Sequence, residues 1–129
     1  MKGMWMAAAL ALAGAAQAAQ PGDLLAGYEA EARKAEAGFR ASASRGEQFF
    51  NARHGGEWSC ASCHGNPPVG QGKHAKTGKA IAPLAPAANA GRFAEAAKVE
   101  KWFRRNCNDV LSRACTPSEK ADVLAWLLR

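Results

Sequence analysis

Apolar side chains recur at helical spacing in three stretches of the chain. They repeat every three or four positions over residues 21–39 and over residues 94–111, and they form a broad face from residue 117 to the C-terminus. This period places apolar side chains on one side of a helix. We therefore predict amphipathic helices over these stretches, the first in one or two pieces because Gly38 lies near its end.

Two helix starts are marked by residues that cap free backbone N–H groups. Ser44 and Glu47 stand three positions apart, which is the spacing of a capping box, and they predict a further helix that begins there. Thr116 and Glu119 repeat this spacing, with Pro117 at the first helical position. Thr116 is therefore predicted to cap the last helix.

The helix predicted after Ser44 should cross the last helix closely. Gly46 is followed four residues later by Phe50, so a small and an aromatic residue share one helical face. A close crossing of two helices needs this combination. We expect the contact near Trp126, and we expect the helix to end near residues 54–56.

Residues 65–91 are rich in glycine and proline and show no apolar period. These residues break helices, so the segment is predicted to be a loop, and its length suits a loop that wraps a bound cofactor. No alternating strand pattern and no internal repeat occurs in the chain. The predicted class is therefore all-α, with three to five helices in a single domain over residues 19–129.

The N-terminus has the pattern of an export signal. Lys2 precedes an apolar run over residues 4–13, and Ala16-Gln17-Ala18 matches a cleavage site. We predict a signal peptide at residues 1–18 and a periplasmic mature chain. The apolar run is too short for a membrane-spanning helix, so stable membrane insertion is not expected, although an uncleaved anchor is the alternative.

The balance of basic and acidic residues limits which classes of binding partner are expected. The chain has 17 Lys and Arg against 11 Asp and Glu. It contains no long basic run and no nucleic-acid-binding motif, so nucleic acid is not an expected partner. A basic balance favours encounter with an acidic redox protein instead.

The pentapeptide at residues 60–64 carries the chemistry. Cys60, Cys63 and His64 form a C-x-x-C-H motif, which is typical of covalent haem c attachment. The two thiols would form thioethers, and the imidazole would bind the iron. A zinc site or a thioredoxin-like pair is the alternative, but Cys107 and Cys115 are spaced wrongly for a second zinc pair, and no βαβ pattern is present.

The ligand opposite His64 is restricted by composition. Methionine is common at this place in cytochromes c, yet it occurs here at positions 1, 4 and 6, all within the predicted signal peptide. A His/Met iron is therefore not expected in the mature chain. An open site remains, as do the following histidine, lysine and asparagine side chains: His54, His74, Lys73, Lys76, Lys79 and Asn106.

Asn106 has the most specific position among these candidates. Its spacing from Trp102, Phe103 and Val110 places its amide on the apolar stripe of the predicted helix. A buried amide needs a polar partner, and either an iron atom or a backbone carbonyl near the helix end would supply one. Cys107 follows directly, and a disulfide to Cys115 is expected in an oxidising compartment, with two free thiols as the alternative.

Four segments together resemble a known family. They are residues 25–29, 77–86, 97–108 and 115–127, and they include the R-N-C-N sequence that contains Asn106. In these segments the chain resembles the oxygen-binding class I cytochromes c known as sphaeroides haem protein, or SHP. The resemblance covers almost the whole mature chain and is more specific than the haem motif alone.

The resemblance implies a class I cytochrome c fold around one covalent haem c. It implies that Asn106 ligates the ferric iron opposite His64 and leaves on reduction, so that oxygen, nitric oxide or another small diatomic can bind. Trp102 and Phe103 would keep that side of the haem dry. The family's redox partners are a di-haem cytochrome c and a membrane cytochrome b.

The resemblance also places the family's disulfide on Cys107 and Cys115. It favours an electron-transfer and gas-binding protein over an enzyme. Two other functions stay open from the sequence: a plain electron carrier with a bis-histidine haem that uses His64 and His74, and a reductase of low activity toward oxygen or nitrogen oxides.

Overall fold

The computed structural model describes residues 14, 17 and 20–129. Apart from residues 14 and 17, the predicted signal peptide lies outside the described residues, so its presence and cleavage stay predictions. No described helix combines the length and the apolar character that a membrane crossing requires.

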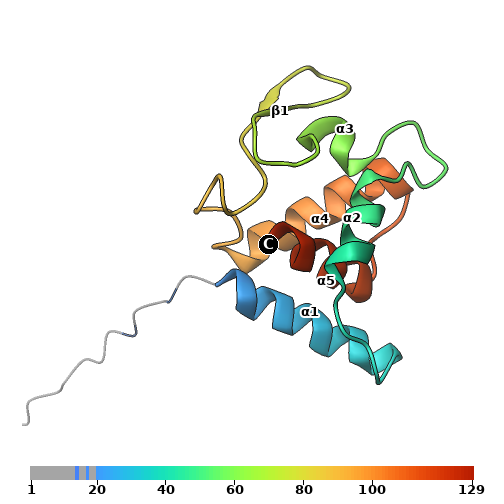
Figure 1. Ribbon diagram of the computed structural model, residues 1–129, viewed down its shortest axis with the longest axis vertical. Coiled ribbons are helices and arrows are strands. Elements are labelled where there is room, and N and C mark those ends of the chain that lie inside the picture. Colours follow the sequence, from blue (N-terminus) through green and yellow to red (C-terminus); the bar gives the residue numbers. More distant parts are fainter. Residues whose placement is uncertain (1–13, 15–16, 18–19) are drawn as a thin grey trace, which may run out of the picture.

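The described residues form five helices and one two-stranded antiparallel sheet (Figure 1). The predicted all-α class with three to five helices is confirmed. The short helix around the haem motif and the small sheet were not predicted. In chain order the elements are α1 (Pro21–Ala35), α2 (Ala43–Asn51), α3 (Cys60–His64), β1 (Gly72–Lys73), β2 (Ala80–Ile81), α4 (Ala96–Leu111) and α5 (Pro117–Leu127).

Helix α5 lies at the centre and packs against both α1 and α2 (Figure 1). On the α1 side, Ala121 joins Ala32 and Phe39 in one buried cluster. On the α2 side, the buried residues are Phe50, Val123 and Leu127. Two apolar faces on one helix explain why the sequence showed a broad stripe from residue 117 onward.

Gly46 lets α2 and α5 approach closely, as predicted. A Cβ atom at this position would overlap the backbone carbonyl of Asp122, so no larger residue fits without moving a helix. One turn later, the ring centroids of Phe50 and Trp126 lie 4.9 Å apart. The predicted contact between the second helix and the last one is confirmed.

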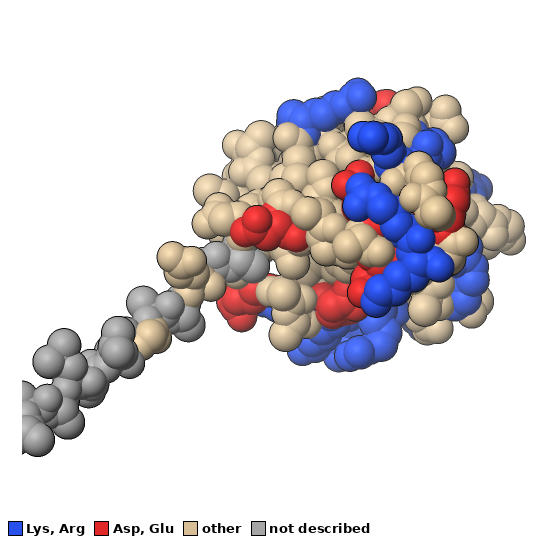
Figure 2. Space-filling view, turned by 90° about the horizontal axis from the view of Figure 1, so that it is seen from below, with Lys and Arg blue, Asp and Glu red and all other residues tan. Residues whose placement is uncertain are grey.

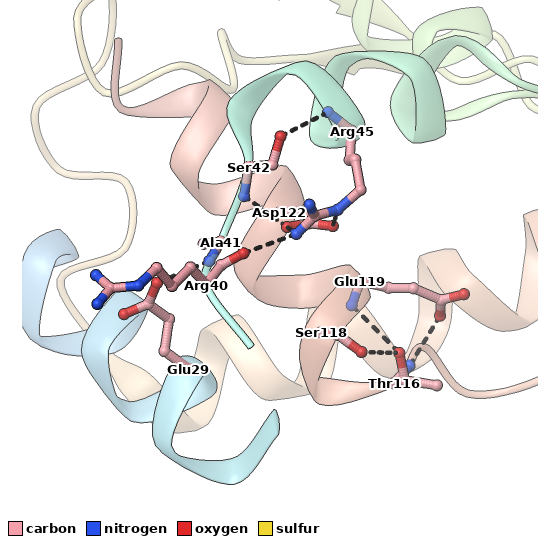
Figure 3. Close-up of polar contacts among 9 residues, drawn as sticks. All are labelled: Glu29, Arg40, Ala41, Ser42, Arg45, Thr116, Ser118, Glu119 and Asp122. Carbon is pink, nitrogen blue, oxygen red and sulfur yellow. Dashed lines mark hydrogen bonds and ion pairs between the residues drawn. The ribbon is translucent and has the colours of Figure 1, made fainter. Parts of the chain in front are cut away.

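The predicted N-cap of α2 is wrong. Ser42, not Ser44, caps the helix, and its hydroxyl oxygen accepts a hydrogen bond from the backbone N–H of Arg45 at 3.2 Å. Asp122 of α5 fixes this start: its carboxylate accepts from the Ser42 N–H at 2.7 Å and from the Arg45 guanidinium at 2.8 Å (Figure 3). A tertiary contact therefore sets the helix start, because Asp122 holds Ser42 and Arg45 together.

Among the other helix ends, the start of α5 was predicted correctly, whereas α2 ends at Asn51 and not near residues 54–56 as predicted. Thr116 caps α5, and Thr116 and Glu119 complete the predicted capping box (Figure 3). Helix α1 ends at Ala35, earlier than predicted, while Phe39 is still buried beyond its end. Arg33 stabilises this exit, because its Nε–H donates to the Phe39 carbonyl at 3.1 Å.

Candidate functional site

The haem motif occupies α3, a single helical turn that Ser59 starts. The Ser59 hydroxyl oxygen accepts from the Ser62 N–H at 3.1 Å, and the Ser62 hydroxyl oxygen accepts from the Ser59 N–H at 2.9 Å. Gly65 ends the turn with a φ of 79°, a conformation that glycine adopts readily. Because Cys60 and Cys63 are three residues apart on a helix, their thiols share one face. Neither thiol forms a disulfide.

The two thiols differ in their surroundings. Cys60 packs against the apolar cluster of Phe50, Val123 and Leu127, and burial raises its pKa to about 11. It therefore stays a neutral thiol near pH 7. The Cys63 sulfur lies closer to the surface loop and accepts the Ala75 N–H at 3.2 Å.

His64 presents a buried ring nitrogen that has no partner. Its Nδ1 is the one buried side-chain nitrogen or oxygen without a hydrogen bond in the described part of the chain. Burial, and then the positive charge of Arg92, lower the His64 pKa to about 4. The ring is therefore neutral near pH 7, which is the form that ligates a metal. An unsatisfied nitrogen in this place calls for a ligand.

Apolar side chains from several elements surround this turn. Phe50 is 1% exposed and lies at the centre, with its ring centroid 6.1 Å from that of His64. The partly buried residues packed around the cluster are Phe49, Cys60, Ala61, Leu84, Phe93, Phe103 and Trp126. Two free thiols, an unpartnered imidazole and an apolar wall fit a covalently attached porphyrin with iron.

Asn106 lies on α4, and its position leaves its amide available. The residue is half-buried, and its side chain takes part in none of the hydrogen bonds among the described residues. The backbone-carbonyl partner that the sequence left open is therefore not found in that set. The neighbouring Cys107 is buried and forms a disulfide with Cys115, with Cα atoms 5.6 Å apart. Asn108 is exposed.

The two aromatic residues predicted beside the haem lie differently. Phe103 packs against the cluster around Phe50. Trp102 is 44% exposed, and the Arg105 guanidinium lies over its ring at 5.6 Å. Of the pair, Phe103 is the one that contributes to the apolar wall.

The alternative histidine ligands each have a backbone partner. The Nε2 of His54 lies 2.8 Å from the Phe49 carbonyl oxygen. The Nδ1 of His74 accepts the backbone N–H groups of Lys76 and Thr77 at 3.2 and 3.1 Å. A neutral imidazole that accepts at Nδ1 carries its proton on Nε2, so neither nitrogen of His74 is ready to ligate iron.

A polar cluster holds α4 against its neighbours. The Tyr28 hydroxyl donates to Glu100 at 2.6 Å, and the Lys120 ammonium donates to the same carboxylate at 3.0 Å. Burial and the hydrogen bond to Glu100 raise the Tyr28 pKa above its usual range. The Tyr28 and Phe103 rings meet edge to face at 5.7 Å. Helices α1, α4 and α5 therefore meet one turn before Asn106.

Arg92 is a site residue that the sequence analysis missed. Its guanidinium donates to the carbonyl oxygens of Ala82 and Pro83 at 2.8 and 2.9 Å, which closes the loop before α4. Its charge also reaches His64. Arg92 matches no motif, and its one signal is that it is the only charged residue between Lys79 and Glu95.

Comparison with known families and proteins shows clear relatives. A family described as a domain of unknown function, DUF1924, matches residues 36–127. The cytochrome c-type protein SHP of Cereibacter sphaeroides is 50% identical over 111 residues, which are 83% of this chain and 81% of that protein. Cytochrome c'' of Methylophilus methylotrophus is 48% identical over 67% of this chain and 63% of that protein.

The chain also matches solved structures of these two kinds of protein. Oxidised SHP, described as an oxygen-binding cytochrome c, matches with a TM-score of 0.74 at 49% identity, over 84% of this chain and 95% of that one. Oxidised cytochrome c'' from Methylophilus methylotrophus matches with a TM-score of 0.75 at 42% identity, over 84% and 92% of the two chains. The family match begins just after α1 and includes every residue of the site.

Proposed function

Because the chain belongs to the SHP family of c-type cytochromes, we propose that it transfers electrons and binds a small diatomic molecule at its reduced haem iron. Its fold is all-α and of the class I cytochrome c type, and its cofactor is covalent haem c. The relative SHP is described as oxygen-binding. Oxygen or nitric oxide is accordingly the ligand class proposed here.

The residues that would hold the cofactor are those of α3. Cys60 and Cys63 would form the two thioethers, and His64 would ligate the iron from one side. When bound, the haem supplies an iron that gains or loses one electron and accepts a neutral diatomic ligand. Phe103 and the wall around Phe50 would keep water away, which favours a neutral ligand over a charged one.

We propose that Asn106 ligates the ferric iron and leaves when the iron is reduced. This proposal is supported by the Asn106 side-chain amide, which is half-buried on α4 and makes no hydrogen bond among the described residues. A neutral amide oxygen is a hard, weak ligand, so it suits ferric iron better than the softer ferrous iron. The Cys107–Cys115 disulfide beside it would limit how far this part of α4 can move.

The proposed setting is the periplasm, after removal of residues 1–18. The proposed redox partners are a di-haem cytochrome c and a membrane cytochrome b, as in the family. The basic charge of the chain is compatible with such partners when they are acidic.

The experiment is to record ferric and dithionite-reduced spectra with and without carbon monoxide for the haem-loaded protein. We compare the wild type with Asn106→Ala, and we use Asn108→Ala as the matched control because Asn108 is exposed on the same helix. We expect the wild type to become high-spin on reduction and to bind carbon monoxide at once. We expect Asn106→Ala alone to change the ferric spectrum.

A third variant, His74→Ala, tests the bis-histidine alternative. Because His74 Nδ1 already accepts two backbone N–H groups, we expect its removal to leave both spectra unchanged. A loss of the ferric low-spin spectrum in His74→Ala would identify His74 as the ligand. Low-spin reduced protein that ignores carbon monoxide would overturn the gas-binding proposal.

A further inference from the structure

We propose that the hairpin of residues 72–81, with Lys73, Lys76 and Lys79, is the surface on which an acidic redox protein docks to deliver its electron. We call these residues the basic hairpin. The inference rests on the electron transfer proposed above and deepens it, because it assigns the place where the partner binds and the chemistry of the partner's surface.

The sequence around the haem motif is free of acidic residues. No Asp or Glu stands between Glu57 and Glu95. The charged side chains in this stretch are three lysines and one arginine, and all three lysines belong to the basic hairpin and are exposed. A surface of one sign attracts partners of the opposite sign and raises their rate of encounter.

Elsewhere in the described chain, six salt bridges pair basic with acidic side chains. Each salt bridge among the described residues joins positions in or next to α1, α2, α4 and α5, whereas none of them includes a lysine of the basic hairpin. Figure 2 shows the face on the α1 side, where basic and acidic side chains intermingle. The hairpin lies at the other end of the molecule (Figure 1). The basic hairpin thus carries three unpaired lysines and no acidic residue, whereas α4, which also has unpaired cations, carries Glu100 and Asp109 among them.

The basic hairpin lies directly on the haem-attachment turn. The Ala75 N–H donates to the Cys63 sulfur at 3.2 Å. Gly72 lies so close to α3 that a Cβ atom there would overlap the Cys63 carbonyl oxygen. A protein that docks on the hairpin therefore comes within a few residues of the thiol that anchors the cofactor.

The hairpin holds its lysines in a defined arrangement. Gly72 pairs with Ile81 and Lys73 with Ala80 in the antiparallel ladder. The turn is closed by the His74 N–H, which donates to the Lys79 carbonyl at 2.8 Å, and by the two backbone N–H groups that donate to His74 Nδ1. A preorganised surface loses less conformational entropy on binding than a flexible one.

The partner that fits this surface is a protein with carboxylates around its own redox centre. One electron leaves the reduced partner, which becomes oxidised, and reduces ferric iron to ferrous iron in this chain. No covalent bond forms between the partner and this chain in the exchange, and the proposed release of Asn106 from the iron follows the reduction. Complementary charge mainly raises the rate of association, and salt screens it.

The test measures reduction of the haem-loaded ferric protein by reduced flavodoxin, an acidic flavoprotein, in a stopped-flow instrument. The hairpin variant is K73E/K76E/K79E, and the matched control is R40E/R53E/R129E, which changes the net charge equally at exposed positions elsewhere that form no salt bridge. At low ionic strength we expect the bimolecular rate to fall about tenfold or more in the hairpin variant. We expect less than about a threefold fall in the control. High salt should remove the difference.

An equal fall in both variants would overturn the proposal, because net charge alone would then set the rate. An unchanged rate in the hairpin variant would overturn it too. The neutral variant K73Q/K76Q/K79Q should show a smaller fall in the same direction, even if the charge-reversed hairpin does not fold. Carbon monoxide binding is measured on the same samples: its failure in the wild type contradicts the proposed gas binding and leaves the docking result intact.

Discussion

At the scale of single residues, the site is marked by polar atoms that have no partner. His64 Nδ1 is buried and unpaired, and the Asn106 amide makes no hydrogen bond among the described residues. His54 and His74, by contrast, each contact a backbone group through one ring nitrogen. An unpaired buried polar atom is costly in a folded protein, so His64 Nδ1 indicates where a ligand belongs. The Asn106 amide is only half-buried, so it is available to a ligand without that cost.

Glu119 offers a residue-scale prediction about pH. A hydrogen bond from Arg113 is the main cause that holds the Glu119 pKa below its usual 4.5, assisted by the Thr116 backbone N–H, which donates to the same carboxylate. A lowered pKa in the folded state stabilises the protein above pH 4.5, and this contribution is lost as the pH falls through the folded-state pKa. Glu119→Gln should therefore reduce the free energy of unfolding by about 0.5 kcal/mol near pH 7, because half-exposed pairs are screened.

Urea unfolding at several pH values checks this prediction. The difference between the wild type and Glu119→Gln should close as the pH falls below the folded-state pKa. In an Arg113→Gln background the same substitution should cost less, since its charged partner is gone. A difference that is constant with pH would show that the cost comes from the capping geometry alone. Glu119→Ala removes that cap as well and should cost about 1–2 kcal/mol.

At the scale of elements, the crossing of α2 and α5 depends on the absence of a side chain at Gly46. A methyl group there would overlap the Asp122 carbonyl, so Gly46→Ala must push the two helices apart. We expect a loss of about 1–3 kcal/mol in the free energy of unfolding. Denaturant titration of the haem-loaded protein measures it.

Gly27→Ala is the matched control for this crossing. Gly27 lies in α1, where nothing surrounds the position of a Cβ atom. Alanine has the higher helix propensity, so this variant should be more stable by up to about 1 kcal/mol. If both glycines gave the same change, helix propensity and not the close approach of α2 and α5 would explain the effect.

The sequence predicted elements well where local residues decide them. Thr116, Pro117 and Glu119 set the start of α5 on their own, and the start was predicted correctly. The start of α2 was missed because Asp122, distant in the sequence, positions Ser42 and Arg45. No local pattern contains that information.

The residues of the site also fall into two groups: those that the local sequence reveals and those that it does not. Cys60, Cys63 and His64 are adjacent in sequence, and the structure places them in one turn. Arg92 and the basic hairpin come from the loop before α4, which has no period and no motif. Their relation to α3 arises through backbone groups, such as the Ala75 N–H on Cys63. Backbone groups are nearly the same in every residue type, so contacts made by them do not restrict which residue occurs there. Sequence patterns therefore do not reveal such contacts.

At the scale of the whole molecule, the chain divides into a helical frame and a haem-facing loop. The buried clusters join α1, α2 and α5, whereas residues 65–95 contribute Pro68 and Ala85, which are buried outside those clusters. The loop residues Leu84 and Phe93 pack on the frame from the side of the haem motif. The frame therefore has a core of its own, while the loop depends on what fills the site.

Removal of the cofactor should separate these two parts. The variant Cys60→Ser/Cys63→Ser cannot form the thioethers, so the loop loses the apolar surface on which it would pack. We expect fast amide hydrogen exchange across residues 65–95 and slower exchange in α1, α2 and α5, together with a lower melting temperature. Hydrogen exchange followed by mass spectrometry, on this variant and on the haem-loaded wild type, measures both parts at once.

The single variant Cys60→Ala serves as the control, because Cys63 can still attach the cofactor through one thioether. Its loop should exchange at a rate between those of the other two proteins. Equal loop protection in all three would mean that the hydrogen bonds of Arg92 and the basic hairpin suffice to order the loop without the haem. Loss of protection in the helices as well as the loop would mean that the frame is too small to fold alone, which is a real constraint for a domain of this length. Comparison of the hydrogen-exchange protection of α5 with that of residues 65–95 thus decides between two roles of the haem. Either it orders the loop of a protein whose helices are already folded, or the whole chain needs it in order to fold.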